Sequence, residues 1–384
     1  MNMLAKIKQV RHEFYMALYR LYPIKKNKII AWNSVFKGFG DSPKYIAEYL
    51  CEKYPGKYDI VWVYDSQKKK PEGLPDGVRC VPYFSIQYLK EISTAKIIIS
   101  NIRTGKIHYF NKRKGQFYLQ TWHSSLRLKK IEGDADEALG EDYVLNSKED
   151  SKKCDLIISG CRFSSDIFKN SFWYDGEVLD SGTPRSDIFF KDNLPIRKKV
   201  SSFFGFDEEK KTVLYAPTFR DGDCDELHGI DAQGILDALE EKTNEKWTFM
   251  YRLHPNVAKA VTPPCDGAYD ATFYPDMQEL VASCDMLITD YSSCMFDMAV
   301  RKMPCVLYVP DMEKYLSSER GFYFDIKDLP FPYALTNSEL SERILNMEAE
   351  KYTAKAEEFL ESIGSFEDGR ACERVAEIIE KITK

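Results

Sequence analysis

Short apolar segments alternate with helical patterns along most of the chain, and this alternation limits the possible folds more than any other feature. The apolar segments are rich in Ile, Val, Tyr and Trp, which favour strands. A repeated strand, helix, strand order predicts parallel sheets covered by helices on both faces. Strands are predicted in the first half of the chain at residues 28–33, 59–64, 96–100, 116–122, 155–159 and 177–179.

A polar segment, KDNLPIRKK at residues 191–199, interrupts the alternation. The 384 residues exceed the ~250–300 at which one core usually stops growing. We therefore predict two α/β domains, 1–192 and 193–384, each binding ligands at the carboxyl ends of its strands. In the second half, strands are predicted at 212–216, 247–252, 286–289 and 305–309, and helices at 231–242, 277–283, 293–301 and along the tail 338–383.

Charge and cysteine content narrow the function. The net charge of −6 argues against a general nucleic-acid binder, which usually carries a basic field. The ten cysteines form no CxxC pair and have no histidines at zinc-ligand spacing, so a reducing cytosol fits better than a disulfide scaffold. No run of 18 apolar residues is present, so we expect a chain that neither spans a membrane nor is secreted.

The amino-terminal 28 residues are basic, with seven lysines and arginines against one glutamate, a net charge of +6. Lys6, Lys8, Arg11 and Arg20 lie between apolar residues at helical spacing. A basic amphipathic helix over residues 1–22 can lie on an anionic membrane surface. A helix packed on the first domain is the alternative, and both stay open. The apolar residues are Leu4, Ile7, Val10, Phe14, Leu18 and Leu21.

Two histidines end predicted strands, one in each half of the chain. His123 closes the segment QTWH, and His254 stands in RLHP. A histidine titrates near neutrality, so it can take a proton from an attacking hydroxyl or give one to a leaving group. Arg252 offers a fork of donors that suits phosphate oxygens. Each histidine can also be a strand-end side chain that only bonds to backbone.

The segment TDYSS joins the strand predicted at 286–289 to the helix that follows it. The amino end of a helix presents unpaired N–H groups and partial positive charge, which suit a phosphate. Ser292, Ser293 and the adjoining Asp290 are therefore candidates for binding the phosphates of a donor nucleotide. An ordinary N-cap serine is the alternative.

Three further residues occupy loops where a nucleotide would bind. Thr218 and Arg220 follow the strand predicted at 212–216, and Arg220 suits phosphate. Gly182 lies in the segment SGTPR near the domain boundary, where it can equally be a turn residue.

Taken in order, these motifs resemble the CDP-glycerol:poly(glycerophosphate) glycerophosphotransferase family of wall teichoic acid synthesis. The resemblance implies a GT-B-like fold of two facing Rossmann-like domains. It also implies transfer of glycerol phosphate from CDP-glycerol, release of CMP, and peripheral attachment to the cytoplasmic face of the membrane. The matching stretches, which cover most of Gly38 to Asp325, are GFGDSPKYIAEYL, QTWHSSLRLKKIEGD, SGTPRSDIF, LYAPTFRDGD, RLHP and DMQELVASCDMLITDYSSCMFDMAVRKMPCVLYVPDMEKYLSSERGFYFD.

The resemblance also implies roles for individual residues. His123 matches the general base, and His254 matches a second histidine near the donor pyrophosphate. Ser292 and Ser293 match the pair that binds donor phosphate at a helix start. The expected partners are CDP-glycerol, a lipid-linked acceptor and an anionic membrane surface, and not nucleic acid. No cofactor is required, while a divalent cation and a homo-oligomer stay open.

One departure from the family pattern concerns the acceptor side. The family usually reads WHGTPLKK, whereas SSLRLKK follows His123 here, with no glycine and one more residue before LKK. The acceptor, and whether the chain acts as a primase or a polymerase, therefore stay open. Other functions compatible with the fold are a ribitolphosphotransferase that uses CDP-ribitol, a nucleotide-sugar glycosyltransferase or 2-epimerase, and a catalytically inactive membrane scaffold.

Overall fold

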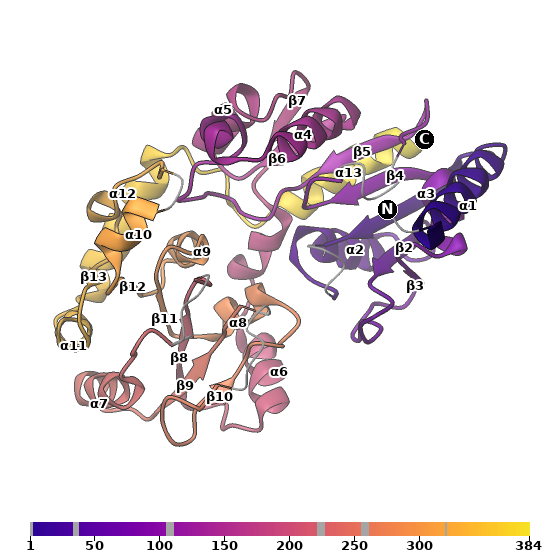
Figure 1. Ribbon diagram of the computed structural model, residues 1–384. Helices are drawn as coiled ribbons and strands as arrows, with labels where there is room; N and C mark the ends of the chain where they lie inside the picture. The colour runs from indigo at the N-terminus through magenta and orange to yellow at the C-terminus, as the bar shows by residue number, and fades with distance from the viewer. Residues whose placement is uncertain (1–2, 34–37, 105–110, 221–226, 255–260, 319–320) are drawn as a thin grey trace. The chain divides into compact units, whose positions relative to one another are not determined.

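The computed structural model describes residues 3–33, 38–104, 111–220, 227–254, 261–318 and 321–384 (Figure 1). The chain forms two compact units. Unit 1 comprises Met1–His123, Leu139–Asp187 and Phe366–Lys384, and unit 2 comprises Ser124–Ala138 and Ile188–Ser365. The chain passes from unit 1 to unit 2 after Asp187, close to the predicted boundary at 192/193. The other changes, after His123, after Ala138 and after Ser365, differ from the prediction of two continuous domains.

Unit 1 is built on a sheet of seven parallel strands in the order β3-β2-β1-β4-β5-β6-β7. Each strand predicted in this half is present, and β3 was not predicted. The near-continuous apolar sequences agree with strands that are buried on both faces. The bounds are β1 (Lys25–Trp32), β2 (Asp59–Tyr64), β3 (Val78–Pro82), β4 (Ala95–Ser100), β5 (Phe117–Gln120), β6 (Leu156–Ser159) and β7 (Glu177–Asp180).

Helices join and cover the strands of unit 1. Helix α2 begins at Asp41, whose carboxylate accepts a hydrogen bond from the Ser42 N–H. The bounds are α1 (Met3–Tyr19), α2 (Asp41–Lys53), α3 (Ile86–Thr94), α4 (Glu141–Lys153), α5 (Arg162–Asn170) and α13 (Ala371–Thr383), with the 3-10 helix η4 (Pro184–Phe190) at the end of the second segment.

The last helix, α13, belongs to unit 1 although it is far from the rest of that unit in sequence. Val375, Ala376 and Ile379 are buried in the same core as strands β1 and β4. The carboxylate of Asp187 accepts hydrogen bonds from the first N–H groups of α13, at 3.0 Å and 2.8 Å. Figure 1 shows α13, in yellow, beside β4 and β5. The helical tail predicted at 338–383 is therefore divided between the two units.

Unit 2 is built on a six-stranded parallel sheet in the order β10-β9-β8-β11-β12-β13. The four predicted strands are present, and the short edge strands β10 and β13 were not predicted. Its buried core includes Val213, Phe249 and Ile288. The bounds are β8 (Lys211–Ala216), β9 (Trp247–Tyr251), β10 (Tyr269–Asp270), β11 (Met286–Thr289), β12 (Cys305–Tyr308) and β13 (Tyr333–Ala334).

The helices of unit 2 follow the strands in sequence, which confirms the predicted α/β alternation. None of the helices in the described ranges has the length and apolar character needed to cross a membrane. The bounds are α6 (Leu194–Phe204), α7 (Ala232–Thr243), α8 (Met277–Ser283), α9 (Cys294–Arg301), α10 (Met312–Ser318), α11 (Asn337–Leu345) and α12 (Ala349–Ser362), with the 3-10 helices η3 (Glu132–Ala138) and η5 (Ile326–Asp328).

Candidate active site

The sheet of unit 2 has a topological switch point between β8 and β11, where the strand order changes direction. Open parallel sheets bind ligands at the carboxyl ends of the strands beside such a point. Thr218 follows β8 and Asp290 follows β11, so both lie at this edge. The candidate residues of unit 2 are therefore placed where the fold favours a ligand.

Asp290 organises the two loops at the switch point. Its carboxylate accepts hydrogen bonds from the Thr218 N–H at 2.9 Å, the Thr218 hydroxyl at 3.0 Å and the Tyr291 N–H at 2.6 Å. Arg220 adds an ion pair at 2.7 Å. Asp290 is only 1% exposed, so these donors satisfy a charge that water cannot reach. Its carboxylate fixes the loops.

Arg220 is held by a second carboxylate, that of Asp311 after β12. Its Nε donates to Asp311 Oδ2 at 2.9 Å and its Nη2 to Asp311 Oδ1 at 3.2 Å. Burial alone would lower the pKa of Arg220, but Asp311 and Asp290 raise it overall. Burial alone would raise the pKa of Asp311, but bonds from Arg220 and Tyr291 lower it overall. The guanidinium is thus neutralised inside the protein.

Two stacked tyrosines complete this cluster. The rings of Tyr291 and Tyr315 lie 3.7 Å apart and nearly parallel, and the Arg220 guanidinium lies 4.7 Å from the Tyr315 ring centre. The Tyr291 hydroxyl donates to Asp311 at 3.1 Å. The sequence analysis missed Asp311 and both tyrosines, although Asp311 also follows a predicted strand. Arg220 and Asp290 therefore hold the switch-point loops together, and the direct phosphate contact expected of them stays a prediction.

Arg252, after β9, has different surroundings. Its Nη1 donates to the backbone carbonyls of Tyr274 at 2.8 Å and Ala271 at 3.3 Å. Among the described residues it makes no ion pair within 4.0 Å. Burial lowers its pKa, and the nearby Asp276 offsets this only in part. This half-buried guanidinium keeps a charge that a phosphate can neutralise.

His254 lies beside the loop that carries Arg220. Its ring centre is 5.5 Å from that of Phe219, and the side chain is exposed. The neighbouring N–H of Leu253 donates to the Thr272 hydroxyl at 3.1 Å, which fixes the chain just before the histidine. Because β8 and β9 are adjacent, His254 after β9 lies next to the segment 218–220 after β8.

Ser292 and Ser293 lie at the amino end of α9, as predicted. Ser293 occupies the N-cap position, but its side chain makes no capping hydrogen bond. Only Ser292 Oγ approaches a helix N–H, that of Cys294, at 3.5 Å. Both serines are half-buried. Ser293 is therefore not a hydrogen-bonding cap. The N–H groups of Met295 and Phe296 donate to the carbonyls of Ser292 and Ser293 at 3.2 Å and 3.1 Å, so the Ser293 hydroxyl, which makes no hydrogen bond with the described residues, is the donor left at this helix end.

In unit 1, His123 lies just beyond the carboxyl end of β5. Its Nδ1 is 3.1 Å from the carbonyl oxygen of Asn101, which follows β4, and the side chain is exposed. A carbonyl can only accept, so Nδ1 carries the proton, and in the neutral ring the lone pair is on Nε2. Trp122 packs against the imidazole with ring centres 4.4 Å apart. This arrangement fixes the tautomer that a general base needs.

Arg185 connects His123 with the loop before α2. Its Nη1 donates to the backbone carbonyl of His123 and pairs with Asp41 at 3.2 Å. The Arg185 N–H also donates to the Ser42 hydroxyl at 3.3 Å. Residues of three motifs quoted above, GFGDSPKYIAEYL, QTWHSSLRLKKIEGD and SGTPRSDIF, thus meet in unit 1. Arg185 positions them, a role that the sequence did not predict for it.

Gly182 belongs to unit 1 and packs against the segment that leads into α13. Its φ of 75° is in the left-handed region, and an added Cβ would lie 3.0 Å from the carbonyl oxygen of Phe366. The adjacent Thr183 donates through its hydroxyl to Glu367 at 2.7 Å. Close backbone packing within unit 1 explains this glycine, and its predicted nucleotide contact stays a prediction.

The segment after His123 joins unit 2. Lys129 pairs with Phe322 in an antiparallel bridge, and its amine lies 4.9 Å from the centre of the Tyr315 ring. The Lys130 N–H donates to the carbonyl of Gly321 at 2.8 Å. The amine of Lys129 therefore lies beside the tyrosine stack, while the backbone of Lys130 bonds to the segment that ends this cluster.

Among the residues of α1 whose side chains are described, one side packs on α3 and the loop before it. The His12 Nε2 is 2.9 Å from the carbonyl of Phe84, and Met16 accepts a hydrogen bond from Ser93. Another side of α1 and the residues after it expose Val10, Phe14, Leu18 and Leu21, of which Phe14 is 64% and Leu21 81% exposed. Arg11 and Arg20 are exposed as well, while the side chains of Lys6 and Lys8 lie outside the described residues.

Comparison with known proteins identifies the family. The family described as CDP-Glycerol:Poly(glycerophosphate) glycerophosphotransferase matches residues 13–381. The chain belongs to this family. A teichoic acid poly(glycerol phosphate) polymerase of Bacillus spizizenii is 31% identical over 98% of both chains. The teichoic acid glycerol-phosphate transferase of Staphylococcus aureus is 29% identical over 97% of this chain and 98% of its own.

Other members of the family are longer. The chain spans about half the length, 51%, of the teichoic acid poly(glycerol phosphate) polymerase of Staphylococcus epidermidis, to which it is 30% identical. A solved structure of the wall teichoic acid polymerase TagF has a TM-score of 0.83 and 28% identity, covering 100% of this chain and 98% of that one. This likeness confirms the GT-B-like glycerophosphotransferase fold. Within the described residues, no three His, Cys, Asp or Glu side chains gather as metal ligands.

Proposed function

We propose that this glycerophosphotransferase transfers glycerol phosphate from CDP-glycerol to a hydroxyl of a lipid-linked or growing glycerol phosphate polymer and releases CMP. The observation that carries the mechanism is the bond from His123 Nδ1 to the Asn101 carbonyl. It leaves Nε2 as the basic nitrogen at the end of a strand. One solved TagF structure is of a variant with histidine replaced by asparagine and soaked with CDPG, which supports a histidine at the site.

The proposed reaction is one in-line displacement at phosphorus. His123 Nε2 takes the proton of the acceptor hydroxyl, and the oxygen forms a bond to the β-phosphorus of CDP-glycerol. The bond from that phosphorus to the bridging oxygen breaks, and CMP leaves with the electron pair. The product is a phosphodiester, and the proton is on the imidazole. Positioning and charge stabilisation supply most of the catalysis in such transfers.

Unit 2 supplies the donor side of this proposal. Arg252 and the serines at the amino end of α9 bind the pyrophosphate in this proposal, because the Arg252 guanidinium donates only to carbonyls among the described residues and the Ser293 hydroxyl makes no capping bond. His254 stabilises the leaving phosphate. Thr218, Arg220 and Asp290 hold the loops in place.

CDP-ribitol is the competing donor, because the same phosphate chemistry would serve. A teichoic acid poly(ribitol-phosphate) polymerase of Bacillus spizizenii is 27% identical over 95% of this chain and 58% of its own. The polymerase of that organism named for glycerol phosphate is 31% identical and matches in length, which favours CDP-glycerol. Mass analysis of the products from each donor with a lipid-linked acceptor distinguishes the two.

Replacing the base tests the proposal. The His123→Asn amide can still donate to the Asn101 carbonyl but cannot take a proton. We expect kcat to fall by about 10²–10⁴-fold, the usual contribution of a general base, with little change in the thermal unfolding midpoint. Turnover is measured as CMP release with a lipid-linked acceptor. Wild-type turnover in either His123→Asn or His123→Ala would exclude the assigned role.

Membrane attachment through α1 is part of the same proposal. The row of Val10, Phe14 and Leu18 is exposed while the helix is already anchored to α3, so the helix packs on unit 1 and still offers an apolar surface. Arg11, exposed on this helix, and Arg20, exposed just after it, suit an anionic membrane, at about 1 kcal/mol each near the surface. The proposed location is the cytoplasmic face of the cell membrane.

Serine substitutions on the exposed row test this attachment without removing the helix. Val10→Ser, Phe14→Ser and Leu18→Ser together should weaken binding to phosphatidylglycerol vesicles by on the order of 10- to 100-fold. Sedimentation with vesicles measures it. Leu145→Ser, at a residue 58% exposed on α4, is the matched control and should bind normally. Equal binding by the triple variant and the wild type would exclude α1 as the membrane contact.

A further inference from the structure

A groove in unit 2 lies at the end of the sheet opposite to Asp290. Its walls are the segment that leads into β13, the end of α11 and the start of α12. Because α11 follows β13 and runs back along the sheet, its last residues lie at the amino ends of the strands, whereas Thr218 and Asp290 follow the carboxyl ends. The groove is therefore separate from the switch-point cluster.

The groove consists of two adjoining hollows of about 380 Å³ and about 390 Å³. Both are lined by Lys327, Leu329, Pro330 and Lys355, so they are continuous. Two joined hollows of this size exceed what a single phosphate group needs. The dimensions suit an extended ligand.

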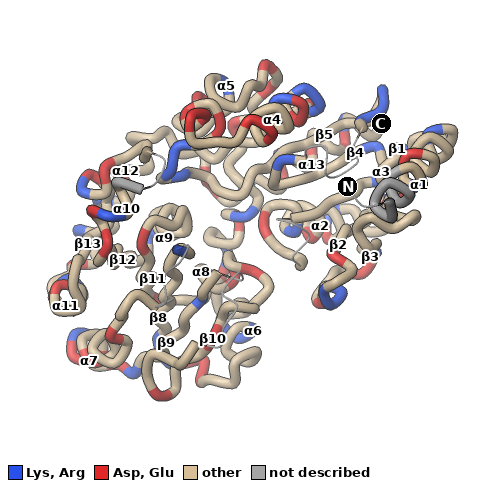
Figure 2. The backbone as a smooth tube through the Cα atoms, in the orientation of Figure 1, with Lys and Arg blue, Asp and Glu red and all other residues tan. Residues whose placement is uncertain are grey.

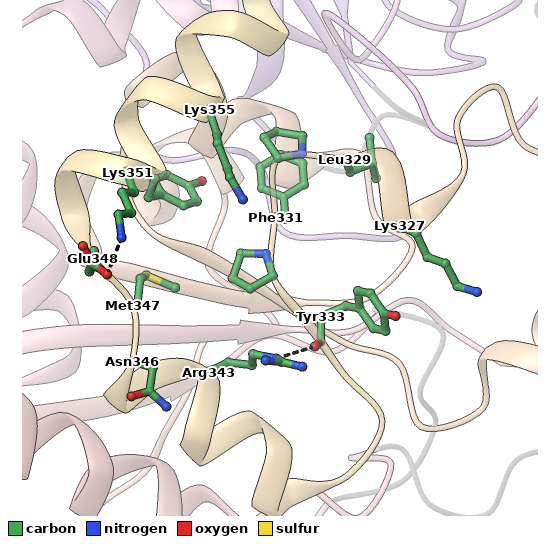
Figure 3. Close-up of a pocket in the computed structure, with 13 residues that line it drawn as sticks. Lys327, Leu329, Phe331, Tyr333, Arg343, Asn346, Met347, Glu348, Lys351 and Lys355 are labelled. Atoms are coloured by element: carbon green, nitrogen blue, oxygen red, sulfur yellow. Dashed lines mark hydrogen bonds and ion pairs between the residues drawn. The ribbon is translucent and has the colours of Figure 1, made fainter.

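Charged and apolar side chains are interspersed along this groove (Figure 3). The first hollow is lined by Lys327, Arg343, Lys351 and Lys355, against the single acidic residue Glu348. Buried apolar residues, among them Leu329 and Phe331, form part of its wall. The second hollow adds two acidic residues, Asp328 and Glu358. The two carboxylates of the second hollow balance its two lysines, so the first hollow is the positive part. Basic and acidic positions both occur along α12 (Figure 2).

The two lysines shared by both hollows are available to a ligand. Lys351 pairs with Glu348 at 2.8 Å, and Arg343 Nε donates to the carbonyl of Tyr333 at 3.2 Å. The amines of Lys327 and Lys355, by contrast, make no hydrogen bond or ion pair with the described residues. Figure 3 shows Lys355 extending from α12 toward Phe331 in the middle of the lining residues, while Lys327 extends outward.

We propose that this groove binds a segment of the glycerol phosphate polymer, a phosphodiester polyanion, away from the reacting end. The inference rests on the proposed function, because that function makes the polymer. A chain of anionic phosphates joined by three-carbon glycerol units suits a groove lined by both cations and apolar side chains. Holding the polymer there would keep its free end near the enzyme between additions, which raises the effective concentration of the acceptor.

Removing the two shared lysines tests the groove. Lys327→Gln combined with Lys355→Gln should weaken binding of a fluorescent glycerol phosphate hexamer by roughly 2- to 30-fold, the range for two exposed ion pairs. Fluorescence polarisation without any donor measures it. The matched control, Lys198→Gln with Lys246→Gln, also removes two exposed lysines from unit 2 but none from the groove, and should bind like the wild type.

The outcomes separate this inference from the proposed function. An equal loss in the control variant, or no loss in the groove variant, would overturn the inference. A groove variant that binds the hexamer normally and loses binding only to phosphatidylglycerol vesicles would also overturn it, because these lipids present a glycerol phosphate group on a membrane surface. Transfer from CDP-glycerol to a single-unit acceptor is measured separately and should be unchanged in the groove variant. If the wild-type chain did not transfer glycerol phosphate from CDP-glycerol, the proposed function would be contradicted. The binding of the hexamer, which is measured without a donor, would still test the groove.

Discussion

Two arginines follow neighbouring strands of unit 2 and differ in what holds them. Arg220, after β8, is paired with Asp290 and Asp311 and stacks over two tyrosines. Arg252, after β9, donates through its guanidinium to backbone carbonyls and to no carboxylate among the described residues. The carboxylates come from the ends of β11 and β12, which lie on one side of β8. β9 lies on the other side, beyond their reach.

This difference indicates which guanidinium serves the fold and which serves a ligand. A buried arginine with two carboxylates has its charge neutralised, so a phosphate would have to compete with them. An arginine bonded to carbonyls keeps its full charge, and a phosphate would be its first anionic partner. Position at a strand end is therefore a weaker guide to phosphate binding than the carboxylates on the adjacent strands.

The largest expected effect comes from breaking the Arg220 cluster. Arg220→Ala leaves Asp290 buried without its cation, and breaking such a pair costs about 3–5 kcal/mol. The free energy of unfolding of the transition that involves unit 2 should fall by this amount in urea titrations. Lys246→Ala removes an exposed ion pair with Glu240 and should cost less than about 1 kcal/mol. Similar losses in the two variants would contradict the distinction between the arginines.

The same variant should change the response to acid. The pKa of Asp311 is lowered in the folded protein, because Arg220 and Tyr291 outweigh the effect of burial. Its contribution to stability is therefore complete above the ordinary carboxyl pKa of about 3.9 and is lost as pH falls through the lowered value. Arg220→Ala removes the main cause of the shift, so stability should depend less on pH in this range.

The sequence predicted most of the architecture because the central strands are long and apolar. β2, β11 and α8 have the bounds that were predicted for them. The two-residue strands β10 and β13 lie at sheet edges and have too few residues to show a pattern. The crossings after His123 and Ser365 were missed because they depend on long-range packing, such as that of α13 against β1 and β4.

The sequence predicted where the candidate site residues lie more successfully than it predicted what each of them does. The motifs located His123, Arg252 and the serines at strand ends and a helix start, because chain order determines those positions. Whether a charge is already neutralised depends on side chains distant in sequence. Asp311 is 91 residues from Arg220, and no local pattern connects the two. The positioning role of Arg185 depends in the same way on Asp41.

A smaller and more selective effect is expected at Arg252. Arg252→Lys keeps the positive charge but loses the planar fork that suits phosphate oxygens. With CDP-glycerol as donor, kcat/KM should fall by about 10-fold, mainly through KM, while the urea midpoint changes little because the side chain contributes only bonds to backbone carbonyls. Arg220→Lys is the matched substitution and should instead lower the midpoint. If Arg252→Lys destabilised the protein and kept wild-type kcat/KM, the guanidinium would be structural, and the two arginines would not differ in role.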